Sequence, residues 1–340
     1  MKKIRTTVDV LSENEVLSIH RSTLRILENV GFRVLNNECM DACKKLGAVI
    51  DTSAKVVKVP AKAMEQVLEE VRKTCAKDQK EPLSERLLGN ISTQVFFVDF
   101  KSRTRRYGTM EDIIKGIILS DRLKNIKASN AAVVPNDVPY NISDVLSYEA
   151  IYKYSSNPGG TYILSPKSAK YIIQMAKLMD KQVSYFLEAV SPLQFRSESL
   201  EMALLFAKQG LPVTLGPMVV GGATGPVTLA GTVALQNAEI LASLFIIRAL
   251  GNVFGHYGCY NHTMDLRTTL CSFGSPNQAL LGMAAAQMGR FYGMQASCNS
   301  GLSDAIMPDF QSGFEKASTT IFSCMAGCTG VGAQGIVGAD

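Results

Sequence analysis

The sequence predicts an α/β protein built on a TIM (β/α)8 barrel that is incomplete at its C-terminus, with an N-terminal, mainly helical appendage. From about Gln94 onward, short apolar runs that end in Pro, Gly, Asn or Asp alternate with helical stretches. Eight runs occur, and their near-continuous apolar character is typical of parallel strands buried on both faces. A doubly wound open sheet is the alternative, but no Gly-x-Gly-x-x-Gly follows the first run, which disfavours its dinucleotide-binding version.

The eight predicted strands share this short apolar pattern, and they are Gln94–Phe100, Ala128–Val134, Gly160–Leu164, Ser184–Val190, Pro212–Met218, Asn252–Tyr257, Met294–Asn299 and Gly332–Val337. The predicted helices between them are Met110–Arg122, Val145–Ser155, Ser168–Met179, Ser199–Lys208, Leu229–Ala249, Pro276–Phe291 and Phe310–Met325. No eighth helix follows the last strand, so we expect the barrel to lack its closure.

The N-terminal region, residues 1–90, is predicted as helices around one hairpin, and residues 91–340 as the barrel domain. Ser12 and Glu15 form a capping-box pattern that starts a helix reaching Gly31. The remaining predicted elements are a helix at Glu38–Leu46, a hairpin of Gly47–Asp51 with Lys55–Pro60, and a helix at Ala61–Thr74.

The composition is that of an ordinary globular protein. Of 340 residues, 46% are hydrophobic and 19% charged, which disfavours a disordered chain. The net charge of +5 is spread out, with one dense basic run from Lys101 to Arg106. No stacking aromatics or recognised binding motif accompany this run, so it predicts a solvated turn between strands and no nucleic-acid partner.

Eight cysteines and an N-terminus without an apolar stretch predict a cytoplasmic protein. The sequence has no run of about 18 apolar residues, so we expect no membrane span. The spacing of Cys39 with Cys43, and of Cys324 with Cys328, would suit two metal ligands on one helical face. No other His or Cys cluster completes a tetrahedral set, so we predict packing thiols and no metal.

Candidate site residues are those at the carboxyl ends of the strands, where TIM-barrel active sites lie. The predicted catalytic residues are Glu188, Tyr257 and Gln334, and the predicted substrate-binding residues are Phe97, Tyr162, His256, Tyr260 and Asn299.

Glu188 lies within an apolar run, where an ionised carboxylate needs a partner or a function. The alternative is a structural carboxylate bridged to a loop donor. The segment from His256 to His262 holds two histidines and two tyrosines. Aromatic faces near a carboxylate suit a cationic amine better than a metal, which would need a third ligand. Asp265 and Arg267 follow this segment and are also candidates for the site. The alternative is that this pair only fixes the conformation of the loop.

The Gly-rich stretch from Gly216 to Gly231 lacks the Gly-Lys-Ser/Thr ending of a phosphate-binding P-loop. A phosphate site is one interpretation. The preferred one is close approach of the backbone to a macrocycle or a partner, because glycine removes the side chain that would stand between them.

The sequence resembles the trimethylamine methyltransferase family. The matching segments, in the same order along the chain, are Glu28–Val34, Gly225–Gly231, Asp265–Thr268 and Gly332–Asp340. The resemblance implies a TIM barrel and transfer of a methyl group from a tertiary or quaternary amine to the cobalt of a separate corrinoid protein, in methylamine metabolism, methanogenesis or acetogenesis. It implies no directly bound cofactor, and we expect a homo-oligomer at full length and no membrane partner.

Trimethylamine enzymes of this family carry pyrrolysine after a Gly-Ala-Asp-like segment, and its imine is proposed to add the amine nitrogen. This chain ends at Gly338-Ala339-Asp340. We therefore expect an amber codon after Asp340 with further coding sequence, and a 340-residue product that lacks activity. The alternatives are a quaternary-amine (glycine-betaine-type) methyltransferase, or a non-catalytic fragment that binds amines or the corrinoid protein.

Overall fold

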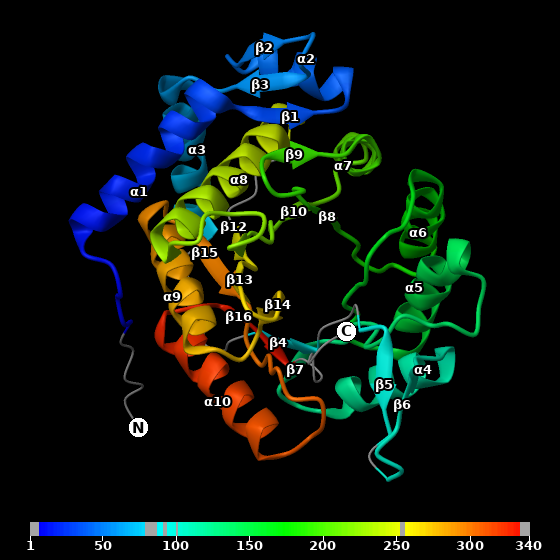
Figure 1. Cartoon of the computed structure of the whole chain (residues 1–340). Coiled ribbons are helices and arrows are strands. Elements are labelled where there is room, and N and C mark those ends of the chain that lie inside the picture. The colour runs from blue at the N-terminus through cyan, green and yellow to red at the C-terminus, as the bar shows by residue number, and fades with distance from the viewer. Residues whose placement is uncertain (1–6, 79–86, 91–93, 100, 252–255, 334–340) are drawn as a thin grey trace. The chain divides into compact units, whose positions relative to one another are not determined.

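The computed structural model describes residues 7–78, 87–90, 94–99, 101–251 and 256–333 (Figure 1). The chain divides into two compact units. The first comprises Met1–Glu85, Tyr185–Asn299 and Ile321–Thr329, and the second comprises Arg86–Ser184, Ser300–Thr320 and Gly330–Asp340. These units cross the predicted boundary near residue 90, which stays a prediction about domains.

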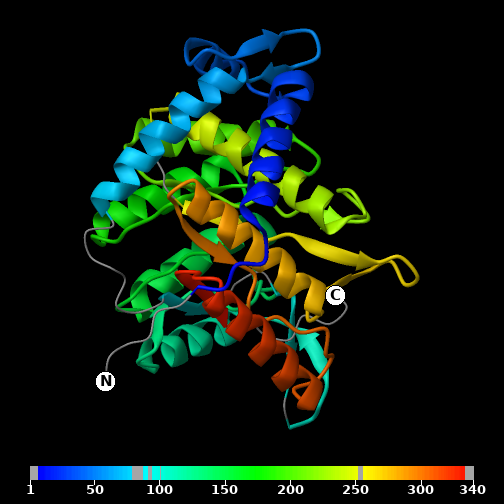
Figure 2. The ribbon, with the colours of Figure 1, turned by 90° about the vertical axis from the view of Figure 1, so that its left-hand side faces the viewer.

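The N-terminal elements of the first unit follow the sequence prediction closely. They are α1 (Glu13–Arg25), a π-helical turn at Ile26–Val30, β1 (Phe32–Val34), α2 (Asn37–Lys45), β2 (Val49–Asp51), β3 (Val56–Lys58) and α3 (Ala61–Asp78). The Ser12 hydroxyl accepts from the Glu15 amide while the Glu15 carboxylate accepts from the Ser12 amide, so the predicted capping box is confirmed. β2 and β3 form the predicted antiparallel hairpin. α1 packs against α8 and α9 of the same unit (Figure 2).

The rest of the first unit alternates strands and helices. Its elements are β8 (Tyr185–Leu187), β9 (Gln194–Phe195), α7 (Ser197–Lys208), β10 (Val213–Leu215), β11 (Val220–Gly221), α8 (Leu229–Ala249), β12 (His256–Cys259), β13 (His262–Asp265), β14 (Leu270–Ser272), α9 (Pro276–Phe291) and β15 (Gln295–Cys298). β8 pairs in parallel with β10, and β12 pairs in parallel with β15. Parallel pairs joined through helices are the βα units that the sequence predicts.

α8 is the central helix of this unit. It is long and apolar enough to cross a membrane by length and composition, but 78% of its most apolar window is buried within the structure. Burial on nearly all sides explains why the helix is apolar all round, as a core helix must be. Thr228 caps its first turn by accepting from the Gly231 amide.

The second unit contains another parallel set, in which β4 pairs with both β16 and β7. Its elements are β4 (Leu87–Asn90), β5 (Phe96–Val98), β6 (Arg105–Tyr107), α4 (Met110–Arg122), β7 (Ile126–Ala128), a 3-10 turn at Tyr140–Ile142, α5 (Ser143–Tyr154), α6 (Pro166–Leu178) and β16 (Gly330–Ala333). α10 (Phe310–Met325) belongs to both units.

Three predicted barrel strands are wrong in position or pairing. The second, Ala128–Val134, shares only Ala128 with the observed strand β7. The first, Gln94–Phe100, instead contains β5, which pairs antiparallel with β6; the parallel strand is β4, which the prediction placed in the appendage. The third, Gly160–Leu164, forms no strand. Its Gly160 amide donates to the Asn130 side-chain oxygen, so a side chain takes the hydrogen bond that a neighbouring strand would accept.

The βα alternation and the parallel pairing agree with a barrel, but no sheet closes among the residues that the structure describes. The last predicted strand begins at β16, and its remainder, from Gln334 to Val337, lies outside the described residues, as does Asp340. The predicted α/β class therefore agrees with the structure, whereas closure of the strands into a barrel stays a prediction.

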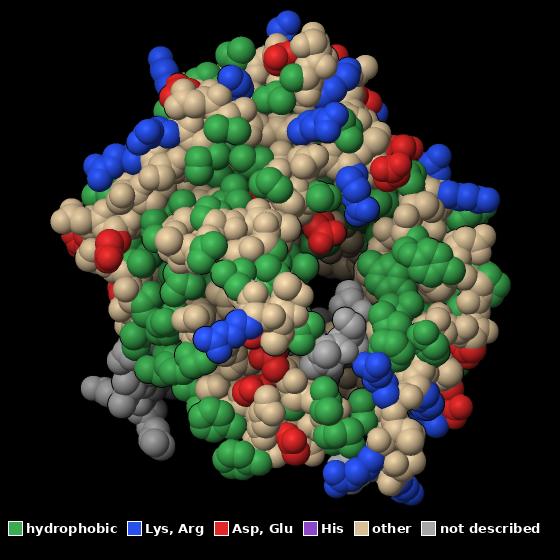
Figure 3. Space-filling model, in the orientation of Figure 1, with side chains coloured by type: hydrophobic (Ala, Val, Ile, Leu, Met, Phe, Trp, Pro, Cys, Tyr) green, Lys and Arg blue, Asp and Glu red, His purple; other side chains and the backbone are tan. Residues whose placement is uncertain are grey.

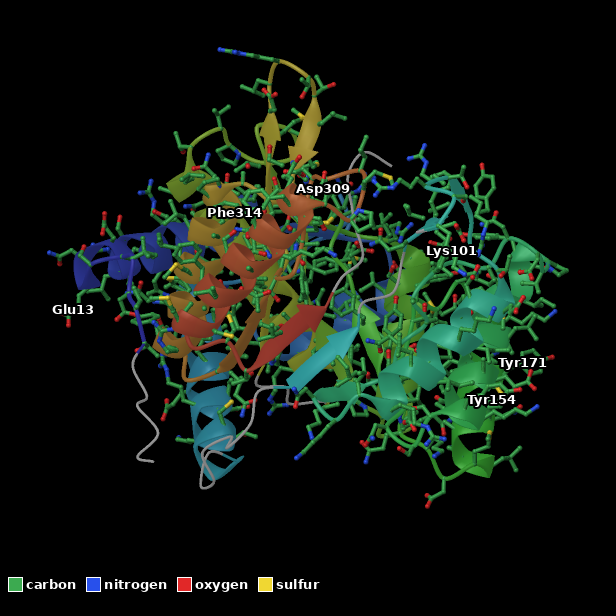
Figure 4. The ribbon with its side chains drawn as sticks, turned by 90° about the horizontal axis from the view of Figure 1, so that it is seen from below. Glu13, Lys101, Tyr154, Tyr171, Asp309 and Phe314 are labelled. Carbon is green, nitrogen blue, oxygen red and sulfur yellow. The ribbon has the colours of Figure 1, made fainter. Side chains whose placement is uncertain are left out.

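The predicted solvated turn at Lys101–Arg106 is confirmed. Residues 101–104 lie between β5 and β6, and Arg105 and Arg106 belong to β6. The side chains of the run are exposed, and Lys and Arg gather there (Figure 3). Figure 4 shows Lys101 at the turn. Arg106 pairs with Asp112, which holds the pKa of that carboxyl down to about 2. The basic run is therefore a structural hairpin.

Candidate functional site

The first unit gathers polar and aromatic side chains on one face of its strands. In β8, Tyr185 and Leu187 are buried, whereas Phe186 between them is 42% exposed. Successive strand residues point to opposite faces, so Glu188 lies on the same face as Phe186. Glu188 is exposed. Water can therefore solvate its carboxylate, so the side chain does not need a buried partner, and its functional role stays a prediction. We call this side of the strands the open face.

Tyr260 follows β12 and supplies the second aromatic ring of the open face. Its ring centroid lies 5.8 Å from that of Phe186. A methyl group added to Gly216, at the end of β10, would overlap both rings, and one added to Gly258 would overlap the Leu215 carbonyl. The ring of Tyr260 can therefore lie across the strands only because these two positions have no side chain.

His256 and Ser297 lie beside Tyr260, on neighbouring parallel strands. His256 Nε2 is 2.7 Å from Ser297 Oγ, and the Tyr260 hydroxyl is 3.3 Å from the same oxygen. Burial lowers the pKa of His256 to about 4 and raises the pKa of Tyr260. Both side chains are therefore uncharged at neutral pH, and they do not repel a cation.

Asn299 is oriented by a chain of hydrogen bonds from behind. Its Nδ2 donates to the Tyr260 carbonyl at 3.2 Å and lies 3.0 Å from His262 Nε2. His262 Nε2 must then be the acceptor, so the proton of the ring is on Nδ1, which donates to Gln278 Oε1 at 3.0 Å. Burial lowers the pKa of His262 to about 4, which keeps this neutral tautomer at pH 7.

Both amide hydrogens of Asn299 are used in this arrangement. Its Oδ1 therefore remains as an acceptor, since no described residue donates to it. A fixed carbonyl dipole beside two aromatic rings and a carboxylate suits a small cation.

Tyr257 belongs to the opposite face of β12. Its hydroxyl donates to Asn237 Oδ1 of α8 at 2.7 Å, and the side chain is fully buried. Asn237 in turn donates to the hydroxyls of Thr23 and Tyr292. These contacts lock the strand onto its helices, so Tyr257 is separated from His256 and Tyr260 although they adjoin it in the sequence.

The remaining predicted residues belong to the second unit or lie outside the described residues. Phe97 belongs to the second unit, where the Arg106 guanidinium lies 4.5 Å from its ring. Tyr162 is also in the second unit, where burial of its hydroxyl raises its pKa and interaction with Ser143 opposes that shift. Gln334 lies outside the described residues. The predicted convergence of all these residues on one mouth stays a prediction.

Three polar residues of α8 were missed by the sequence reasoning, and each holds a segment next to the open face. Gln236 binds the Pro217 carbonyl and the Val219 amide, after β10. Glu239 accepts from the Ser191 hydroxyl at 2.7 Å and the Leu193 amide at 2.8 Å, after β8. Asn237, which accepts from the Tyr257 hydroxyl, is the third. Three polar residues close together within an apolar helix are the sequence signal that could have identified them.

The other candidate motifs have structural roles. Asp265 accepts from the Arg267 amide and the Thr268 hydroxyl, which supports the alternative that it fixes the loop. The Gly-rich stretch supplies Gly216 beneath Tyr260, the strand β11, and the cap of α8. Within the described ranges, no three His, Cys, Asp or Glu side chains gather in a way that could hold a metal ion.

A shallow pocket of about 160 Å³ lies in the second unit, between α4 and α5, and none of the predicted site residues lines it. Its lining consists of Met110, Ile114, Leu146, Glu149, Ala150, Lys153 and Tyr154. Its polar lining residues Glu149, Lys153 and Tyr154 are not joined by hydrogen bonds like those that connect the side chains of the open face, so we place the candidate site on the open face.

The geometry thus defines an α/β protein with a cation-compatible face at the ends of parallel strands. A family model described as trimethylamine methyltransferase matches residues 1–335. The chain belongs to the trimethylamine methyltransferase family, which confirms the resemblance seen in the sequence.

Its curated relatives include two proteins of Desulfitobacterium hafniense. The trimethylamine methyltransferase is 25% identical over 93% of this chain and 67% of that protein. The glycine betaine methyltransferase is 25% identical over 96% of this chain and 71% of that protein. The trimethylamine methyltransferase of Methanosarcina thermophila is 26% identical, over 97% and 73%.

Among solved structures, the monomethylamine methyltransferase of Methanosarcina barkeri is similar with a TM-score of 0.56 and 12% identity, over 95% of this chain and 74% of that one. At that identity, the likeness concerns the fold alone.

Proposed function

We propose that this protein is a methyltransferase that moves a methyl group from trimethylamine to the cobalt of a cognate corrinoid protein. The observation that carries the proposal is the open face, where Phe186 and Tyr260 offer aromatic rings beside the Glu188 carboxylate. Rings and a carboxylate attract a methylated ammonium group, and the neutral His256 does not oppose it. Membership of the family supplies the reaction class.

The chemistry favours a cationic substrate. Reduced cobalt attacks a methyl carbon with its electron pair, and the carbon–nitrogen bond breaks so that nitrogen keeps the bonding pair. A nitrogen that carries a positive charge leaves as a neutral amine. A site that stabilises the cation therefore holds the substrate in the form that can react, and it also positions the methyl group for attack.

The alternative substrate is a quaternary amine such as glycine betaine, which one relative is named for. Betaine carries a carboxylate, which would need a cationic partner. The segments 185–190, 213–218, 256–262 and 295–299, which form the open face, contain no Lys or Arg, and they contain one acidic residue, Glu188. This composition favours an amine without a carboxylate.

The direct test is methyl transfer. Protein purified from its native host is mixed with trimethylamine and the reduced corrinoid protein, and methyl–cobalt formation is followed by its absorbance. We expect transfer from trimethylamine, and none when the corrinoid protein is replaced by buffer. Transfer from glycine betaine but not from trimethylamine would establish the alternative, and transfer from neither would refute the proposal.

Glu188→Gln is expected to weaken binding of trimethylammonium about tenfold at low ionic strength, because a partly solvated unit charge is removed from beside the cation. Isothermal titration calorimetry measures the affinity. The loss should shrink as salt is added. Glu201→Gln, an exposed carboxylate on α7, is the matched control and should bind as the wild type does. Equal affinities of the Glu188 variant and the wild type would remove Glu188 from the site.

Gln278→Leu is expected to weaken binding of trimethylammonium about tenfold. Without its acceptor, the proton of His262 can move to Nε2, and the Asn299 amide must then turn and withdraw Oδ1. Gln278→Glu keeps an acceptor and raises the pKa of His262 above its value of about 4. Its affinity should match the wild type at pH 8 and fall as the pH is lowered.

The control for this pair is Gln287→Leu, the same change on the same helix, where the side chain binds Leu11 instead. It should leave ligand affinity unchanged. A purely structural role for Gln278 would give the Glu variant no pH dependence beyond that of the wild type.

A further inference from the structure

Two cysteine thiols of the first unit lie in contact and have no role in the proposed reaction. Cys298, the last residue of β15, has its Sγ 3.1 Å from Sγ of Cys328, which follows the C-terminal end of α10. Both are almost fully buried, at 4% and 1% exposed. The structure records no disulfide bond at any of the eight cysteines.

The distance is short enough for bond formation with little movement. A disulfide needs its sulfurs about 2.05 Å apart, so the two thiols must approach by about 1 Å. Cys328 lies just beyond a helix end, next to Gly327 with its positive φ of 82°. Helix ends open more readily than helix centres, which offers this movement and a path for a small oxidant.

The surroundings also distinguish the two sulfurs. Sγ of Cys298 lies 3.2 Å from the Ser323 hydroxyl. The contacts with Cys328 and Ser323 lower the pKa of Cys298, whereas the contact with Cys298 and burial raise the pKa of Cys328. Cys298 is thus the thiol of the pair that ionises first, and the thiolate is the form that reacts with oxidants.

We propose that Cys298 and Cys328 are a dithiol oxidation site that a peroxide converts to an intramolecular disulfide. The Cys298 thiolate attacks a peroxide oxygen, the oxygen–oxygen bond breaks, and a sulfenic acid and hydroxide form. The Cys328 thiol then attacks the sulfenic sulfur, and water leaves with the proton of the thiol. Both sulfurs are oxidised and one hydrogen peroxide is reduced to water.

The disulfide would act on the open face through β15. Cys298 stands between Ser297 and Asn299, whose side chains point to the open face while that of Cys298 points away from it. Drawing Cys298 toward Cys328 displaces the strand, so we expect oxidation to weaken trimethylammonium binding about threefold to tenfold. This second step rests on the proposed function; the disulfide itself does not.

The test uses the full chain, reduced, freed of thiol reagents and exposed to hydrogen peroxide without denaturant. Remaining thiols are then alkylated in denaturant, and the unreduced digest is analysed by mass spectrometry. The expected result is a peptide pair linked through Cys298 and Cys328, restored to two free thiols by dithiothreitol, with Cys39 and Cys43 still alkylated. A link between Cys298 and Cys259, its neighbour on β12, would overturn the proposal, as would links only between chains or no link.

Variants separate the pair from general oxidation. Cys328→Ser should abolish the link and leave Cys298 to oxidise further, to sulfinic acid. Cys271→Ser, at a partly exposed thiol away from the pair, is the control and should form the link at the wild-type rate. Because the mapping on the wild type needs no variant, a misfolded Cys328 variant would not affect it. A mapped disulfide without any change in affinity would retain the oxidation site and refute its effect on the open face.

Discussion

Gly216→Ala is expected to weaken trimethylammonium binding about thirtyfold or more. The new methyl group would overlap the rings of Tyr260 and Phe186, so at least one ring must leave its position. An aromatic face contributes about 0.5–2 kcal/mol to binding a cation, and both rings are affected. Overpacking should also lower the free energy of unfolding by about 1–3 kcal/mol. Calorimetric titration and urea unfolding measure the two effects.

The matched control is Gly313→Ala, in the first turn of α10, where an added methyl group meets nothing within 4 Å. It should leave binding unchanged and stabilise the helix by up to about 1 kcal/mol, since alanine favours helix over glycine. If Gly216→Ala bound the ligand as tightly as the wild type does, the two rings would not be part of the binding site.

Glu239→Ala is expected to lower the free energy of unfolding by about 2–4 kcal/mol, the largest stability effect that we expect from one side chain. The carboxylate of this fully buried residue accepts from the Ser191 hydroxyl and the Leu193 amide. Its removal leaves both donors without acceptors and also a cavity in the core. Urea unfolding at pH 7 measures the change. Glu239→Gln keeps one acceptor and the volume, so it should lose less than half as much.

The pH dependence of the Gln variant tests the state of the carboxyl. Burial raises the pKa of Glu239 above its ordinary 4.5, although its hydrogen bonds with Leu193 and Ser191 partly oppose the shift. A raised folded pKa stabilises the fold fully at pH below 4.5, and this contribution is lost as the pH rises through the folded value. The advantage of the wild type over Glu239→Gln should therefore shrink from pH 4 to pH 8. A constant difference would contradict the raised pKa.

The pKa shifts of the two histidines of the candidate site give stability the opposite dependence on pH. The pKa values of His256 and His262 are lowered to about 4, so their stabilising contribution is present above about pH 6.5 and is lost as the pH falls toward 4. The wild type and Glu239→Gln contain the same two histidines, so the contribution of the histidines cancels in the difference between their free energies of unfolding.

Much of the local structure could be predicted because its causes are local. The helices Leu229–Ala249, Pro276–Phe291 and Phe310–Met325 begin and end where the sequence placed them. Cap residues mark two of these starts, as Thr228 and Ser275 each accept from the first turn. Short-range hydrogen bonding and apolar runs therefore determine these elements before any tertiary contact forms.

Strand pairing was less predictable, because it depends on partners far away in the sequence. Gln94–Phe100 and β4 both look like short apolar strands, and only the pairing shows that β4 joins the parallel set. The same applies to Gly160, whose hydrogen-bond partner is a side chain thirty residues away.

By itself, the sequence determined the α/β class and the family, and it indicated the segment from His256 to His262 as a candidate site. Only the tertiary structure decided which residues of that segment share a face. Tyr257 and Tyr260 are equally aromatic in the sequence, but one binds Asn237 in the core and the other lies above two glycines on the open face. The structure also decided that Gln278 orients Asn299 and that Cys298 meets Cys328. The reason is that helix and strand periods arise from neighbouring residues, whereas a site is made by contacts between residues that the chain brings together only on folding.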